Sequence, residues 1–433
     1  MSEILLNISR YLMIFIMLFY VYFSFRNKYH VVQNILTAVF FVLSFVIIYY
    51  HTKSSAWIAL AVFETVYALS TVFLYKIIYP KHSKLLLNNM IMLLVIGFIM
   101  IFRLAPSNAW KQFVIIALGT GISFGIPAIM RYEKFLISAK YILASVGVFL
   151  LGITLVLGNT SFGANLSISI GAFSLQPSEF VKLTYVIFLA GALSNAKKIK
   201  DYLIITGLAA LHSIILVLSN DLGAALIFFV VYVMMLYIST GRIRYLLIGS
   251  GLGCVGAFLA YVFVDHVKTR VIAWLNPWDY IDGKGYQITQ SLFAIGTGGL
   301  FGLGLCEGLP TKIPVVAKDF VFAAIAEEFG LIFAIGVILL CIATFMGIMR
   351  IAVRVNKVFY KLVCVGFGIM YILQCFLTIG GVTKFIPSTG VTLPFVSYGG
   401  SSVLSSIIMF AIIQAINILD SSRAKKKGEK NGK

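Results

Sequence analysis

Long apolar runs recur from one end of this chain to the other, and they constrain its fold more than any other feature. We count about thirteen, each close to the 20 residues that a helix needs to cross about 30 Å of hydrocarbon. The chain is 61% hydrophobic, whereas soluble domains are about 45–50% apolar. The runs also lack the short alternating strands of a membrane barrel. The sequence therefore predicts an all-α polytopic membrane protein.

The predicted spans are separated mostly by short connections. By residue number they are 4–25, 31–50, 55–78, 85–103, 112–130, 135–157, 178–195, 203–219, 222–239, 243–265, 321–349, 358–381 and 393–418. Lys and Arg concentrate in alternate connections and in the C-terminal tail. Because basic loops face the cytoplasm, this pattern predicts a cytoplasmic C-terminus and, with an odd number of spans, an extracytoplasmic N-terminus. The connections 159–177, 266–320 and 382–392 then face outward.

The excess of basic residues has a membrane explanation. The formal net charge is +19, which in a soluble protein would suggest nucleic acid as a partner. Here the basic residues lie in short connections and in the tail 423–433, where anionic lipid would attract them. We therefore expect membrane lipids and no nucleic acid as partners. Arg26 and Lys28 follow the first span where a cleavage site would need small residues, so no cleaved signal peptide is expected.

The polar motifs are distributed unevenly along the chain. Three spans precede the stretch 79–84 and carry few polar residues, with Glu64 as the exception. Every motif follows that stretch. We therefore divide the chain into N-terminal transmembrane helices (1–82), a core (83–422) with a long extracytoplasmic connection, and a basic cytoplasmic tail. The five cysteines form no CxxC pair, and most lie in apolar runs, which favours packing over disulfides or metal binding.

Four stretches at the predicted outer face are rich in glycine together with proline or polar residues. They are GANLSISIGAFSLQPSEFVKL (163–183), SNDLGAAL (219–226), NPWDYIDGKGYQITQSLFAIGTGGLFGLGLCEG (276–308) with KIPVVAKDFVFAAIAEEFG (312–330) after it, and IPSTGVTLPFVSYGGSS (386–402). Each alone is a weak signal. Together and in this order they resemble the FtsW/RodA/SpoVE family, the SEDS proteins of bacterial cell elongation, division and sporulation. The resemblance covers about 83–418.

The resemblance implies a fold and an activity. The fold is a SEDS-type ten-helix core, to which the first three helices are an addition. The activity is that of a peptidoglycan glycosyltransferase, which polymerises lipid II into glycan strands at the outer face of the bacterial cell membrane and releases undecaprenyl diphosphate. It implies a class B penicillin-binding protein as partner. Two alternatives stay open: a translocase (flippase) for the lipid-linked precursor, and a non-catalytic membrane scaffold for the penicillin-binding protein.

Asp319 is the leading candidate for the catalytic residue. One interpretation makes it a helix N-cap, because Asp accepts hydrogen bonds from the first free N–H groups of a helix. The other places it at a water-accessible cavity, where it activates the acceptor hydroxyl as a base or through a divalent cation such as Mg or Mn. In the family, the Asp of this DF-x-F motif is the essential acidic residue. No organic cofactor is expected.

Several other residues are candidate ligands of lipid II or its diphosphate. Glu179 and Lys182 lie three residues apart on one helix face, so they form a local ion pair or place Lys182 in a groove for the diphosphate. Arg270 has a planar guanidinium group that can donate two hydrogen bonds to a phosphate. Lys318 adjoins Asp319 and would lower its pKa if the two side chains meet. Ser397 and Tyr398, at the start of the last predicted span, line a substrate groove or simply pack.

Three acidic residues have structural interpretations. Asp221 precedes an apolar run at a helix-cap position. Glu327 and Glu328 are consecutive, so they point about 100° apart, and we expect a structural ion pair with Lys182 as a candidate partner. The glycines in GTGGLFGLG favour close backbone packing or a turn over a phosphate loop, because no strand precedes them.

Two stretches depart from the family pattern. Asn165 and Leu166 stand where the family has Arg-Trp, and residues 314–318 (PVVAK) replace Pro-Glu-x-His-Thr. These differences leave the predicted fold unchanged and keep the non-catalytic alternative open.

Overall fold

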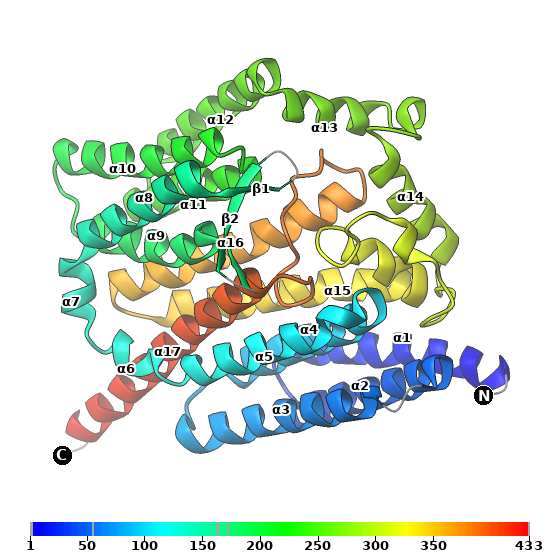
Figure 1. Cartoon of the computed structure of the whole chain (residues 1–433). Helices are drawn as coiled ribbons and strands as arrows, with labels where there is room; N and C mark the ends of the chain where they lie inside the picture. The colour runs from blue at the N-terminus through cyan, green and yellow to red at the C-terminus, as the bar shows by residue number, and fades with distance from the viewer. Residues whose placement is uncertain (1–2, 54–55, 162–163, 171–172, 432–433) are drawn as a thin grey trace. The chain divides into compact units, whose positions relative to one another are not determined.

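The structure is a computed structural model, and it describes residues 3–53, 56–161, 164–170 and 173–431. Figure 1 shows the elements in chain order. The α-helices are α1 (Glu3–Arg26), α2 (His30–Thr52), α3 (Ala56–Ile78), α4 (Lys84–Leu104), α5 (Pro106–Ser123), α6 (Ile126–Met130), α7 (Glu133–Ser138), α8 (Lys140–Leu157), α9 (Pro177–Leu193), α10 (Ile199–Leu218), α11 (Leu222–Thr240), α12 (Ile243–Phe263), α13 (Asp265–Leu275), α14 (Tyr286–Gly298), α15 (Val321–Arg354), α16 (Val358–Val382) and α17 (Gly400–Asn431).

The helical membrane architecture predicted from the sequence is confirmed. Within the described ranges, twelve helices are long and apolar enough to cross a membrane, and the predicted thirteenth corresponds to α9. This helix has 17 residues, which gives it a length of about 26 Å. It therefore falls just short of a full span, and its first two turns carry Glu179 and Lys182.

The chain divides into two compact units, each built from separate stretches of sequence. The first unit comprises Met1–Thr120, Ile272–Gly347 and Cys375–Gly399, and the second comprises Gly121–Val271, Ile348–Gln374 and Gly400–Lys433. The three N-terminal helices belong to the first unit, together with the part of the connection 266–320 that follows Ile272.

Helix α4 forms the centre of the first unit. Every residue from Leu85 to Phe102 is buried, as expected for a helix that is apolar on all sides. Two asparagines are the exceptions in composition, and both are hydrogen-bonded. Asn88 donates to the carbonyl of His30 (2.9 Å). Asn89 accepts from Ser24 (2.9 Å) and donates to Thr344 (3.1 Å). These bonds connect α1, α4 and α15. Glu64 of α3 is also buried, and its Oε2 has no hydrogen-bond partner among the described residues.

Helix α9 is one of the deeply buried helices of the second unit. It packs against α8, α11 and α17, and the aromatic rings of Tyr185 and Phe188 lie against His212 of α10. A glycine permits the close approach of α10, because a Cβ at Gly147 would lie 2.6 Å from Nε2 of His212. The Glu179 and Lys182 side chains are therefore carried by a tightly held helix.

The structure corrects the all-α prediction in the connection 159–177. It contains a three-stranded antiparallel sheet in the order β1 (Asn159–Ser161), β2 (Ala164–Ile170), β3 (Phe173–Leu175). Residues 162–163 and 171–172 of this connection lie outside the described residues. The strand signal was present in the sequence, because apolar residues alternate with serine from Leu166 to Ile170.

Two further corrections concern the connection 266–320 and the start of the last span. Residues 266–320 contain helical elements, namely α13, α14 and the short 3₁₀ turns η1 (Trp278–Tyr280) and η2 (Pro310–Lys312). The last span begins at Gly400 and not at 393. Residues 393–399 instead form turns that pack closely against α4. This packing requires a glycine in α4, because a Cβ at Gly97 would lie 2.5 Å from the carbonyl oxygen of Phe395.

Helix α15 is interrupted in the first unit. Gly330 has φ 87° and ψ 167°, which no helical residue adopts. The helix thus consists of a short first part, which begins two residues after Asp319, and a long part from Leu331. Glu327 and Glu328 lie near the end of the short first part.

Candidate functional site

Asp319 lies at a small hollow in the first unit. The hollow has a volume of about 10 Å³ and is lined by Asp319, Phe320, the end of α16 and the turn 388–391. Asp319 is partly exposed, not sealed behind apolar side chains. The hydroxyl of Thr389, which also lines the hollow, is buried and has no partner among the described residues. A hollow of this size holds about one water molecule. A larger group would therefore reach the Asp319 carboxylate and the Thr389 hydroxyl only from the entrance of the hollow.

The loop before Asp319 is held by hydrogen bonds to its backbone. Tyr398 N–H donates to the carbonyl of Ala317 (2.7 Å), and Gln287 Nε2 donates to that of Pro314 (2.9 Å). Val315 has a φ of 57°, which is rare for a β-branched residue and costs on the order of 1–3 kcal/mol. Such strain persists only where surrounding contacts impose it, and it lies four residues before Asp319.

Ser397 and Tyr398 are turn residues, not residues of a membrane span. Ser397 Oγ accepts from the N–H of Leu393 (2.9 Å), which closes the turn. The phenol of Tyr398 donates to Asn108 (3.2 Å), and burial raises its pKa. The packing interpretation holds for Ser397, whereas Tyr398 also connects its turn to the loop that carries Asp319. Lys318 is exposed at this loop.

Glu328 forms an ion pair, but not with Lys182. Its Oε1 accepts from Nε of Arg103 at 2.9 Å, and the Glu328 side chain is fully buried. Nη2 of Arg103 also donates to the carbonyl of Gly308 (3.0 Å). The suggested Lys182 partner is therefore wrong, because α4 supplies the cation. The sequence could not identify it, since Arg103 and Glu328 are far apart along the chain.

Glu327 has a different role. It is buried, and its Oε1 accepts from the backbone N–H of Leu309 at 2.9 Å. The second carboxylate oxygen of each glutamate, Oε2, has no partner among the described residues. The two side chains thus hold the same short stretch, Gly308–Leu309, one through a direct bond and the other through Arg103.

The glycine-rich segment 298–304 packs against the interruption of α15. A Cβ at Gly302 would lie 2.3 Å from the carbonyl oxygen of Glu328, and one at Gly298 would lie 2.2 Å from that of Ala326. Gly299, Gly302 and Gly304 all have positive φ. The close-packing interpretation is confirmed.

In the second unit, Glu179 and Lys182 form the predicted pair. Nζ of Lys182 lies 2.7 Å from Oε1 of Glu179, and both side chains are buried. Oε2 of Glu179 accepts from Ser405 of α17 (2.9 Å), and Nζ of Lys182 reaches Gln374 (3.5 Å). The pair is therefore part of a network over three helices, and the charges compensate each other inside the protein.

Asp221 caps α11, as predicted. Its Oδ1 accepts from the N–H of Ala224 (3.1 Å), and Oδ2 accepts from Ser178 (3.3 Å). Burial raises the pKa of this carboxyl group, while the bond from Ala224 opposes the increase. Arg270 is partly exposed on α13 in the same unit, close enough to His266 to lower the pKa of that imidazole in addition to the larger effect of burial.

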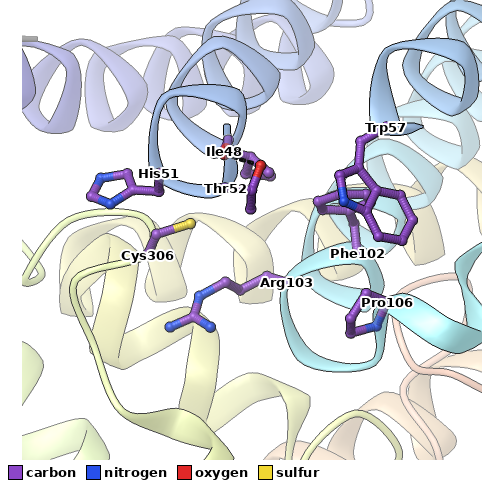
Figure 2. Close-up of a pocket in the computed structure, with 8 residues that line it drawn as sticks. All are labelled: Ile48, His51, Thr52, Trp57, Phe102, Arg103, Pro106 and Cys306. Atoms are coloured by element: carbon purple, nitrogen blue, oxygen red, sulfur yellow. Dashed lines mark hydrogen bonds between the residues drawn. The ribbon is translucent and has the colours of Figure 1, made fainter. Parts of the chain in front are cut away.

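Another cavity lies in the first unit, and no sequence pattern predicted it. It has a volume of about 260 Å³, and Figure 2 shows the eight residues that line it. The lining includes His51 and Trp57 from the N-terminal helices and Arg103 and Cys306 from the core. Burial raises the pKa of the Cys306 thiol to about 12. Among the lining residues, Cys306 alone lies in one of the motif stretches (276–308), and the others join it only through folding.

The described residues contain no group of three His, Cys, Asp or Glu side chains that could hold a metal ion. Asp319 would therefore contribute a single carboxylate. Mg²⁺ is often bound by one or two carboxylates together with phosphate oxygens of a substrate, so the residue fits a cation that arrives with a diphosphate, but not a closed protein site.

Helices of this length and composition define a multi-pass helical membrane protein, and a partly exposed carboxylate lies directly before one of them. The FtsW/RodA/SpoVE family, described as cell cycle proteins, matches residues 81–422. The chain belongs to this family.

Several curated relatives are similar to the chain. Stage V sporulation protein E of Bacillus subtilis is 31% identical over 355 residues, which cover 77% of this chain and 95% of the relative. Peptidoglycan glycosyltransferase RodA of Mycobacterium leprae is 30% identical over 364 residues, 78% of each chain. RodA of Mycobacterium bovis is 35% identical over 271 residues, 59% of this chain, and the match spans 58% of that relative's length.

Solved structures share the fold. The chain is similar to one in a structure described as structural coordination of polymerization and crosslinking by a peptidoglycan synthase complex, with a TM-score of 0.67, 24% identity, and coverage of 78% of this chain and 97% of the other. It is also similar to the Rod shape determining protein RodA of Thermus thermophilus, with a TM-score of 0.59, 24% identity, and coverage of 78% and 96%.

Proposed function

We propose that the chain is a peptidoglycan glycosyltransferase that polymerises lipid II into glycan strands. Family membership and relatives named as peptidoglycan glycosyltransferases support this activity. The observation that carries the proposal is the position of Asp319, a partly exposed carboxylate at a hollow directly before α15. A carboxylate placed in this way can meet a substrate at the membrane surface.

The proposed role of Asp319 is that of a base. It takes the proton from the acceptor sugar hydroxyl as that oxygen bonds to the anomeric carbon of the donor. The bond from this carbon to the diphosphate oxygen breaks, and undecaprenyl diphosphate leaves with the electron pair. A positioned general base contributes about 10²- to 10⁴-fold to such a step. The unpartnered hydroxyl of Thr389 offers a second polar group at the same hollow.

A divalent cation such as Mg or Mn would neutralise charge on the leaving diphosphate, and Asp319 is the residue proposed to contact it. Lys318, Arg270, Tyr398 and the Glu179–Lys182 pair are proposed substrate contacts. For Lys182 this requires release from its buried partners, so a structural role is favoured by the network around it.

A class B penicillin-binding protein is the proposed partner. The similar fold in a complex that couples polymerization and crosslinking supports this partnership. The proposed location is the bacterial cell membrane, with the site on the extracytoplasmic face and the C-terminus in the cytoplasm, because the basic connections lie on the opposite side from the motifs.

The test is strand synthesis by the purified native protein in liposomes that contain lipid II, with products resolved by length. The proposal predicts strands, and chelation of divalent metal followed by Mg or Mn addition tests the cation separately. Transfer of lipid II across the bilayer without strands would instead identify a translocase. Copurification of a penicillin-binding protein with neither strands nor transfer would identify a scaffold.

A further inference from the structure

We infer that α1 and α2 brace the interruption of α15 and thereby hold the segment that leads to Asp319. Arg10 is the central positioning residue of this brace. The kinetic part of the inference rests on the proposed glycosyltransferase function, whereas the structural part does not. Both helices precede residue 81, where the match to the family begins, so the brace is an addition to the segment that the family shares.

The interruption needs support because it replaces helix hydrogen bonds with bonds to a distant segment. Two N–H groups, of Leu303 and Gly304, donate to the carbonyls of Glu327 and Glu328, each at 2.9 Å. In the other direction, Leu331 N–H donates to Gly299 (2.9 Å), and Ile332 N–H donates to Leu300 (3.2 Å). The four bonds satisfy backbone groups that Gly330 leaves without helical partners. The segment 299–304 therefore supplies the hydrogen-bond partners that α15 lacks at its interruption.

Helix α1 holds this segment from its other side. Nη1 of Arg10 donates to the carbonyl of Gly302 at 2.9 Å. The ring of Tyr11 meets that of Phe301 edge to face, with centroids 5.4 Å apart. Arg10 lies inside the apolar span Asn7–Arg26, where an arginine is costly unless it is bound to protein or water. Its bond to a backbone carbonyl of the core accounts for its presence there.

Helix α2 contacts both sides of the interruption. The ring of Phe40 stacks on Phe333 with centroids 5.5 Å apart and lies 5.9 Å from that of Phe329. At its C-terminal end, Nε2 of His51 lies 3.3 Å from Oε1 of Glu307. This pair is partly exposed and contributes little stability, but it joins α2 to the stretch directly after the glycine segment.

The braced segment connects to Asp319 at both ends. In one direction the chain runs from Gly302 to Leu309, where Glu327 and the Arg103–Glu328 pair hold it, and then to Asp319. In the other direction, Glu327 and Glu328 lie on the short first part of α15, which begins two residues after Asp319. A displacement of Gly302 is therefore transmitted to the start of α15 as well as to the loop.

Hydrogen exchange of the full-length protein tests the brace without reference to activity. Arg10→Gln should raise the exchange rate of amides in 299–304 and 331–332 by about tenfold, since a charged hydrogen bond is lost beside them. Arg10→Lys should restore part of the protection. The matched control is Arg26→Gln at the other end of α1, an exposed arginine that contacts only the ring of Tyr22 among described residues. A peptide from α9 in the second unit serves as the internal reference.

Strand synthesis adds the kinetic readout. The inference predicts that Arg10→Gln lowers kcat several-fold and leaves KM for lipid II unchanged, while Arg26→Gln changes neither. Unchanged exchange in 299–332 would overturn the brace whether or not the protein polymerises. If exchange increases in Arg10→Gln but the native protein makes no strands, the brace is supported and the glycosyltransferase function is refuted.

A second variant covers the case in which Arg10→Gln does not fold. Tyr11→Ala removes the contact with Phe301 and the hydrogen bond that the Tyr11 hydroxyl accepts from Arg10 (3.2 Å), both of them contacts of the brace, from a side chain that is 41% exposed. Its control is Tyr22→Ala, 51% exposed on the same helix. Faster exchange at 299–304 in Tyr11→Ala alone would support the brace, and equal exchange in both variants would contradict it.

Discussion

At the scale of single residues, the Arg103–Glu328 pair joins a buried carboxylate to a cation from another helix of the first unit. Glu328 is fully buried, and Arg103 is its cation. Arg103→Ala should destabilise the protein by about 3 kcal/mol or more, because it leaves a buried carboxylate without a partner. Thermal unfolding in detergent measures the effect, with the exposed Arg26→Ala as control.

The double variant Arg103→Met with Glu328→Leu distinguishes the contribution of the ion pair from that of the other contacts of Arg103. Replacement of both charges by apolar groups is often neutral or stabilising, so we expect it to recover most of the lost stability. A double variant as unstable as Arg103→Ala would show that the bond from Arg103 to Gly308, and not the ion pair, holds the unit together.

Residue patterns predicted some contacts of this site and not others. Asp221 was predicted as a cap and Glu179–Lys182 as a pair, because helix geometry fixes partners three residues apart. The cation for Glu328 and the hydroxyl of Thr389 at the Asp319 hollow were missed. Both depend on segments that are remote in sequence, for which no local spacing exists.

At the scale of elements, the glycine segment and the interrupted α15 form one unit of backbone packing. Gly302→Ala should destabilise the protein strongly, because the new Cβ would meet backbone atoms of Glu328 at 2.3 Å and of Phe329 at 2.5 Å in a residue with φ 78°. Gly296→Ala is the matched control, since nothing lies within 4 Å of its Cβ position. Within a helix this change should stabilise by about 0.5–1 kcal/mol. Equal unfolding temperatures for both variants would contradict the packing.

Hydropathy predicted the long elements well and the short ones poorly. A run of twenty apolar residues has one stable conformation in hydrocarbon, the helix. The short strands of 159–175 and the amphipathic α13 and α14 give much weaker signals, so hydropathy predicts connections there. Leu393 and Phe395 are apolar and extend the hydropathy signal of the last span to 393, although Phe395 packs in a turn over Gly97.

At the scale of the whole molecule, the order of helices and the family were predicted from the sequence, whereas the division into two units was not. The first unit joins residues 1–120 with 272–347 and 375–399, and no shift in composition marks those limits. Family membership extends over 81–422, while the first unit also contains the three helices before it.

Orientation in the membrane is a prediction at this scale. A membrane-impermeant maleimide applied to intact cells should label Asp282→Cys in the predicted outer connection and leave Lys200→Cys unlabelled until the cells are opened. Both positions are exposed, so access depends on the side of the membrane alone. The unsubstituted chain gives the background from its five cysteines. The reverse labelling pattern would place the site in the cytoplasm.

The catalytic role of Asp319 is tested most directly by the rate of strand synthesis from lipid II by Asp319→Asn. The native protein and Asp282→Asn, which removes an exposed carboxylate of the same connection, are measured beside it. We predict a fall of at least about 100-fold for Asp319→Asn, the effect of losing a general base, with normal membrane insertion and no change for Asp282→Asn. A variant that polymerises as fast as the native protein would contradict the account.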